Sequence, residues 1–112
     1  MPDVILLYTT WPDAEKAQAA GEAAIAARLA ACINIFAPIQ SIYRWEGQIE
    51  RASETPMTLK TTAEAAPALR RLLTRLHPYD LPCILGWAVS DELSHPEFLA
   101  WVKAETTAPA DR

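Results

Sequence analysis

Residues 33–61 have the sequence INIFAPIQSIYRWEGQIERASETPMTLKT, and the architecture of the chain follows from them. Glu46-Gly47 separates two runs rich in β-branched and aromatic residues, and Gly47 is free to take a positive φ, so the pattern predicts a hairpin. Its strands would extend from Ile33 to Trp45 and from Gln48 to Thr61. Thirteen residues at roughly 3.3 Å each span about 43 Å, whereas a compact chain of 112 residues has a diameter of about 34 Å. We therefore expect the hairpin to bend or to protrude.

Two prolines indicate where the hairpin changes direction. With a two-residue turn at Glu46-Gly47, Pro38 and Pro56 become near neighbours across the two strands. Proline has no N–H to donate to a ladder, so we expect the pairing to break or bulge at this level. Beyond the break, residues 39–54 would form an arm.

One face of this arm is rich in large apolar side chains. It carries Ile39, Tyr43 and Trp45, and aromatic residues of this kind make a patch on the order of several hundred Å². Patches of this size usually mark an interface, so we predict that these three residues contact other subunits. The alternative is that the C-terminal helix of the same chain covers them.

Two elements precede the hairpin. Val4–Tyr8 is a short continuous apolar run, which is typical of a strand buried on both faces. Thr10 or Asp13 can cap the helix that follows. This helix is rich in alanine and is predicted to continue to about Ala31.

Two helices and one strand follow the hairpin. The threonine pair at 61–62 would cap a helix whose apolar stripe begins at Leu69 and repeats at i+3, i+4 and i+7. The next predicted strand is Cys83–Val89. Ser94, with Glu97 three residues later, has the spacing of a capping box at the start of the last helix.

The order of the predicted elements is β-α-β, then β-α-β, then a helix. This order predicts an α+β fold, the ferredoxin-like split βαβ sandwich, with a long bent hairpin and a C-terminal helix. Residues 1–112 would form a single domain, and the tail after about residue 104 is expected to fray.

Composition and charge narrow the classes of function. About half of the residues are apolar and about a fifth are charged, as in ordinary globular proteins. No apolar run approaches the roughly 20 residues that span a bilayer, and a net charge of −4 argues against a nucleic-acid partner. The first residues lack the basic character of a signal peptide, so we expect a cytoplasmic protein in which Cys32 and Cys83 stay unpaired.

The motifs indicate neither catalysis nor a closed metal centre. Cys83 with His77 is the only conceivable pair of nucleophile and base, and we predict that the protein is not an enzyme. The sequence has no Cys-x-x-Cys or His-x-x-x-His spacing, which argues against a zinc site within one chain. His77 and Cys83 are nevertheless candidate metal ligands. A histidine at the end of a helix can instead bond the free carbonyl groups there.

Charged residues at strand ends and turns indicate a binding cleft. Glu54, Lys60 and Asp80 lie at such places, and the edge of a trimer would gather them, together with Tyr79, from two chains. We therefore expect the functional site between subunits, near the join of the arm and the turn at residues 77–79. Carboxylates favour a cation and Lys60 an anion, so the sign of the ligand's charge stays open. Lys60 has the alternative of a salt bridge with a neighbouring carboxylate.

Several segments resemble the CutA divalent-cation tolerance family. The most specific are SIYRWEG at residues 41–47 and HPY at residues 77–79, and LAACIN at 29–34 and LKT at 59–61 also have the family's order and spacing. The resemblance covers nearly the whole chain. It implies a ferredoxin-like fold assembled as a tight homotrimer, broadly like the trimers of PII-type signalling proteins.

The resemblance also implies a link to tolerance of copper and other divalent metals. The copper ligands proposed for some bacterial members are a cysteine in the first loop and two adjacent histidines, and these positions hold Thr9, Leu76 and His77 here. Cys83 stands where the family often has an acidic residue, and it offers a soft ligand. We therefore expect weaker binding of Cu(II), dependent on His77.

Two functions stay open. One is a trimeric, metal-responsive or small-ligand-binding protein that binds Cu(II) or another divalent cation and needs no organic cofactor. The alternative is a PII-like signalling or interaction scaffold with indirect effects on metal tolerance.

Overall fold

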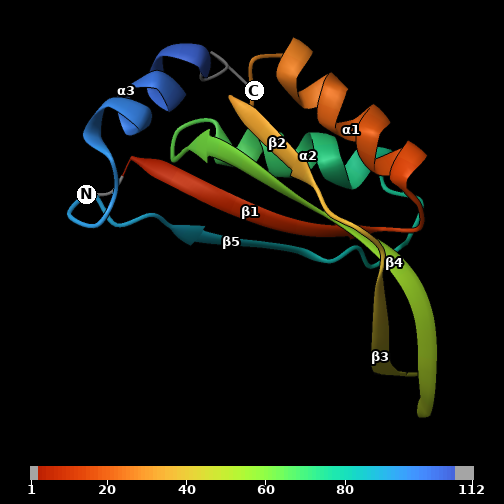
Figure 1. Cartoon of the computed structure of the whole chain (residues 1–112). Coiled ribbons are helices and arrows are strands. Elements are labelled where there is room, and N and C mark those ends of the chain that lie inside the picture. The colour runs from red at the N-terminus through yellow and green to blue at the C-terminus, as the bar shows by residue number, and fades with distance from the viewer. Residues whose placement is uncertain (1–2, 108–112) are drawn as a thin grey trace.

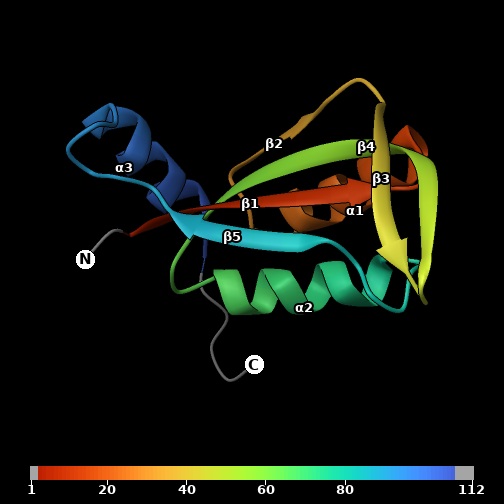
Figure 2. The ribbon, with the colours of Figure 1, turned by 90° about the horizontal axis from the view of Figure 1, so that it is seen from below.

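A computed structural model describes residues 3–107. It contains an antiparallel sheet with the strand order β2-β4-β1-β5, and β3 pairs with the far part of β4. Helices α1 and α2 cover one face of the sheet, and the opposite face has no helix over its centre (Figures 1 and 2). The predicted α+β class and the order of the elements are confirmed. The elements are β1 (Val4–Trp11), α1 (Ala14–Ala26), β2 (Cys32–Ile35), β3 (Ile39–Trp45), β4 (Gln48–Thr62), α2 (Ala66–Leu76), β5 (Ile84–Ala88) and α3 (Pro96–Glu105).

The main core lies between the sheet and the helices α1 and α2. Alternate residues of β1 face these helices, because side chains of a strand alternate between its two sides. Leu6 and Tyr8 point to the other side and are only half-buried, so β1 is not buried on both faces as its continuous apolar sequence suggested. The large buried residues of the core are Leu7, Trp11, Met57, Leu59, Leu69 and Leu73.

The hairpin bends at the level of the two prolines, as predicted. In the sheet Ile35 pairs with Met57, and in the arm Ile39 pairs with Glu54. Between these two pairs the first strand has one residue more than β4, so the register shifts by one residue. The extra residue makes a bulge, so the single strand predicted before the turn is two strands, β2 and β3. Beyond the bulge the arm leaves the sheet on the side opposite α1 and α2 (Figure 1).

Residues with positive φ end two of the elements. At the hairpin turn both Glu46 (φ 49°) and Gly47 (φ 79°) adopt such angles, as a type I′ turn requires. Arg28 (φ 58°) does so just after α1 and turns the chain back toward the sheet. The helix therefore ends earlier than the predicted position near Ala31, and Ala31 instead donates its N–H to Lys60 O at 2.8 Å.

The helix caps follow the sequence only in part. Asp13 caps α1, as one of the two predicted alternatives, and its carboxylate accepts an N–H of the first turn at 2.8 Å. The prediction for α3 was wrong, because the ring of His95, and not Ser94, accepts an N–H of the first turn at 3.2 Å. The threonine pair at 61–62 does not cap α2, whose N-cap is Ala65.

Helix α3 packs at the end of the sheet that lies far from the arm (Figure 1). There Leu99 and Val102 form a small second cluster with Val4. The helix therefore does not cover the arm, which excludes the alternative that α3 buries the arm's apolar face. Thr107 N–H donates to Arg28 O at 2.8 Å, and the last part of the tail predicted to fray, residues 108–112, lies outside the described residues. No helix between residues 3 and 107 is both long and apolar enough to cross a membrane.

Candidate functional site

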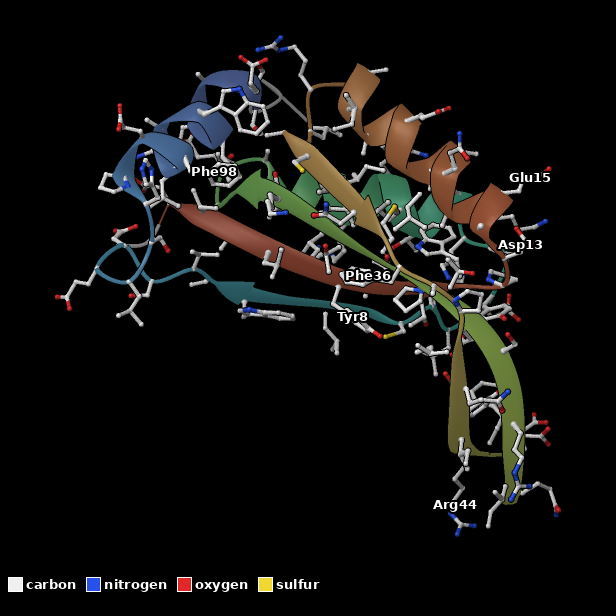
Figure 3. All side chains as sticks on the ribbon, in the orientation of Figure 1. Tyr8, Asp13, Glu15, Phe36, Arg44 and Phe98 are labelled. Atoms are coloured by element: carbon white, nitrogen blue, oxygen red, sulfur yellow. The ribbon has the colours of Figure 1, made fainter. Side chains whose placement is uncertain are left out.

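A cleft opens between the arm and the uncovered face of the sheet. Its volume is about 690 Å³, within the range of small-molecule sites. Tyr8 projects from the sheet on the same side as the arm (Figure 3). The residues that line the cleft are Tyr8, Thr10, Ile39, Ser41, Tyr43, Arg44, Trp45, Glu54, Tyr79, Asp80, Leu81 and Cys83.

The two faces of the arm differ in charge. Residues paired across a ladder share a face, and neighbours along a strand alternate. Arg44 borders the cleft, but its side chain extends beyond the end of the arm and away from the sheet (Figure 3). The inner face, toward the cleft, holds the aromatic and acidic residues of the arm: Ile39, Ser41, Tyr43, Trp45, Gln48, Glu50, Ala52 and Glu54. The outer face is aliphatic and basic: Gln40, Ile42, Arg44, Ile49, Arg51 and Ser53.

Most residues predicted for function meet at this cleft. Nine residues were predicted for function, and His77 and Lys60 are the two that do not line the cleft. The seven that line it are Ile39, Tyr43, Trp45, Glu54, Tyr79, Asp80 and Cys83. The metal candidate Cys83, the predicted cleft residues Glu54, Tyr79 and Asp80, and the arm residues therefore share one site. The residues that line this cleft all belong to one chain. The expected position of the functional site between subunits stays a prediction.

The carboxylates of the cleft have no cationic partner in the described chain. Glu54 is half-buried and Asp80 is exposed. Within residues 3–107 the only ion pairs are those of Asp13 with Lys16 and of Asp3 with Lys103. The cleft therefore presents negative charge that no ion pair within residues 3–107 neutralises.

Two tyrosines of the cleft have raised pKa values, and the charge of Glu54 is one of the causes. Burial, and then the neighbouring Cys83 and Glu54, raise the pKa of Tyr8 above its ordinary value. Burial, and then Glu54, Tyr43 and Asp13, raise the pKa of Tyr79. Both phenols stay protonated at neutral pH and keep an O–H to donate.

His77 lies behind the wall of the cleft and is buried. Its Nε2 faces Thr10 O at 2.7 Å, so this nitrogen carries the proton, because a carbonyl oxygen can only accept. Its Nδ1 accepts the N–H of Tyr79 at 3.2 Å, and its ring stacks on Trp11 with centroids 4.3 Å apart. Both ring nitrogens are thus engaged, and this geometry favours a structural role over that of a metal ligand.

Lys60 lies apart from the cleft, on the uncovered face of the sheet near β2. Its Nζ donates to the side-chain oxygen of Asn34 and lies 3.9 Å from Cys32 Sγ. Within one chain its partners are therefore uncharged, and it contacts neither Glu54 nor another carboxylate. A site or a salt bridge that Lys60 would form with another subunit stays a prediction. Both cysteines are unpaired, as predicted.

The copper ligands implied by the family resemblance do not fit this chain. Thr9 lies inside strand β1, is fully buried, donates to Met57 O at 2.8 Å and accepts Trp11 Nε1–H at 2.7 Å. Leu76 offers no donor, and His77 has no free nitrogen. Across the described range 3–107 no group of three or more His, Cys, Asp or Glu side chains could hold a metal ion.

Five residues that line the cleft were not predicted as site residues: Tyr8, Thr10, Ser41, Arg44 and Leu81. Tyr8 ends the apolar run Val4–Tyr8, where no alternation indicates which side chains face a site, and Thr10 was predicted only as a possible helix cap. Only the antiparallel pairing of β1 with β4 places them beside Glu54.

These observations define a class of protein: a small α+β protein of ferredoxin-like fold in which a protruding hairpin bounds a cleft lined by aromatic rings and carboxylates. Residues 5–105 match the family model described as CutA1 divalent ion tolerance protein. The chain belongs to this family.

Relatives with similar sequences occur in bacteria, archaea and animals. The chain is 36% identical to the divalent-cation tolerance protein CutA of Thermus thermophilus over 106 residues, which is 95% of this chain and 99% of that protein. It is 35% identical to protein CutA of Homo sapiens over 104 residues, which is 93% of this chain and 57% of that protein.

Solved structures agree with the fold. CutA from Xylella fastidiosa has a TM-score of 0.89 at 36% identity, with 94% of this chain and 99% of that one covered. The periplasmic divalent cation tolerance protein CutA from Archaeoglobus fulgidus has a TM-score of 0.86 at 35% identity, with 91% and 97% covered.

Proposed function

We propose that this protein is a homotrimer that serves divalent-cation tolerance by binding a cation in the cleft, and that it catalyses no reaction. The observation that carries the proposal is the pair of carboxylates, Glu54 and Asp80, that have no cationic partner in the described chain. Uncompensated negative charge in a cleft with low-dielectric walls concentrates cations.

The exposed arm supports assembly. An isolated two-stranded hairpin is at best marginally stable in water, and the arm is exposed on both faces. Ile42 and Ile49 on its outer face are 64% and 61% exposed. An acidic inner face and a basic outer face complement each other in a head-to-tail contact, and such contacts form a ring when the rotation between subunits closes. That the assembly has three subunits is what the family resemblance implies.

The state of His77 supports the absence of catalysis. Cys83 is the one nucleophile that lines the cleft with any histidine near it in sequence. Both nitrogens of His77 are hydrogen-bonded to the backbone, so His77 is not free to act as a base for this thiol.

Sedimentation and light scattering test the assembly. We expect a mass of about three times 12.4 kDa at micromolar concentration. The double variant Ile42→Ser with Ile49→Ser should lower it, as should Trp45→Ala. Leu93→Ser, at an 89% exposed residue outside the arm, is the matched control and should leave the mass unchanged. A monomeric wild type would contradict the proposal.

Calorimetry tests the cation. Metal-stripped protein should bind Cu(II), and Glu54→Gln should weaken this binding about tenfold, as expected when one charged ligand is lost. Unchanged affinity in a variant that is still trimeric would show that the cation binds elsewhere.

A further inference from the structure

We infer that a second site, separate from the cleft, binds a small zwitterion: an α-amino acid with a short side chain. The site is a pocket of about 230 Å³ beside α3, at the end of the sheet that lies far from the arm (Figure 1). None of its residues belongs to the arm or to the cleft, so the inference does not depend on the proposed cation site. The residues that line the pocket are Asp3, Thr62, Ala63, Glu64, Lys103 and Thr106.

The hydroxyl group of Thr106 is the observation that points to a ligand. Only 8% of this residue is exposed, and its buried Oγ1 has no hydrogen-bond partner within residues 3–107. Buried polar groups of native proteins almost always have a partner, so one that lacks it needs an explanation. Because Thr106 lines the pocket, a molecule bound there can supply the missing partner.

The backbone on both sides of Thr106 is held in place. The guanidinium group of Arg28 donates to Ala104 O and to Thr107 Oγ1, each at 3.1 Å. In return, Thr107 N–H donates to Arg28 O at 2.8 Å. These bonds fix the end of α3 against the turn after α1. The wall of the pocket that carries Thr106 is therefore preorganised, which lowers the entropy lost on binding a ligand.

The hydrogen-bonding groups that remain free in the pocket match both charged groups of an amino acid. Lys103 Nζ donates to Asp3 Oδ2 at 3.3 Å, which uses one of the three N–H donors of its ammonium group. The other two, together with the hydroxyl of Thr106, can donate to a carboxylate. Glu64 forms no ion pair within residues 3–107, so its carboxylate can accept hydrogen bonds from an ammonium group.

A simple ion fits this pocket less well than a zwitterion. Lys103 repels a metal ion, and the carboxylates of Asp3 and Glu64 repel an anion. The volume also argues against a large ligand, because the pockets of drug-sized molecules measure about 300–1,000 Å³. A short amino acid brings one charge of each sign to a pocket that offers a partner for each.

Calorimetry with L-alanine tests the inference, and two analogues serve as controls. Propionate is alanine without the ammonium group, and ethylamine is alanine without the carboxylate. We expect saturable binding of L-alanine and none of either analogue. Thr106→Val keeps the shape of the side chain and should weaken the binding by about tenfold, as should Glu64→Gln, since each removes one polar contact. Glu92→Gln, at an exposed carboxylate outside the pocket, is the matched control and should bind as the wild type does.

Thermal unfolding of the free protein separates a binding role of Thr106 from a structural one. Since the buried hydroxyl has no partner in the unligated chain, Thr106→Val should unfold at the temperature of the wild type or above it. A lower unfolding temperature would overturn the inference, because the hydroxyl would then have a partner inside the protein. No saturable binding of L-alanine, equal binding of either analogue, or unchanged affinity in both Thr106→Val and Glu64→Gln would overturn it as well.

Discussion

Replacement of His77 by alanine separates its structural role from a role as metal ligand. The change removes two buried hydrogen bonds, to Thr10 O at 2.7 Å and from Tyr79 N at 3.2 Å, and the stacking of two rings at 4.3 Å. Each hydrogen bond contributes about 1 kcal/mol, a buried carbonyl left without a donor costs about 1–3 kcal/mol, and a ring pair adds about 0.5–1.5 kcal/mol. We therefore expect His77→Ala to lower the free energy of unfolding by about 3.5–6.5 kcal/mol.

Urea denaturation at a fixed protein concentration measures this effect, because assembly makes the apparent stability depend on concentration. His95→Ala is the matched control: His95 is the second of the two histidines, is exposed, and caps α3, so its loss should cost only about 1 kcal/mol. Cu(II) titration of both variants accompanies the denaturation. If His77→Ala keeps its stability within about 1 kcal/mol of the wild type while Cu(II) binding disappears, the structural reasoning is refuted and His77 is a metal ligand.

Two further predictions concern the strand β1 and the cleft. Thr9→Val should destabilise the protein by about 2–4 kcal/mol, because it leaves two buried hydrogen-bonding partners unsatisfied. The control Thr58→Val, on the other face of the sheet, should cost less than about 1 kcal/mol in the same urea assay. Equal losses in the two variants would contradict this prediction. Glu54→Gln should bring the pKa of Tyr8 and of Tyr79 down toward the ordinary value of 10.0, as followed by NMR of the ring carbons. Since the pKa values of both tyrosines are raised in the folded state, the two phenols contribute stability that is present below pH 10.0 and is lost as pH rises through the raised pKa. Glu54→Gln should make this loss of stability at alkaline pH smaller. Unchanged titration in Glu54→Gln would mean that the carboxylate is not close to the phenols.

Features that depend on neighbours along the chain were predictable. The turn at Glu46-Gly47, the register of the arm and the bulge near Pro38 and Pro56 all follow from local backbone chemistry. Helix α2 follows from the spacing of its leucines. The end of α1 was not predictable, because Arg28 adopts a positive φ that glycine usually takes, and the return of the chain to the sheet determines it.

The chain's own sequence thus determined the strands, the arm and the family, whereas the tertiary structure decided what the cleft contains. Tyr8, Glu54 and Tyr79 lie far apart in sequence, and they meet because β1 pairs with β4 and the turn after α2 returns to the base of the arm. The same packing gave His77 two backbone partners and moved Lys60 away from the cleft. Spacing along a chain determines which face of an element a residue occupies, but only the packing of distant elements determines which faces meet.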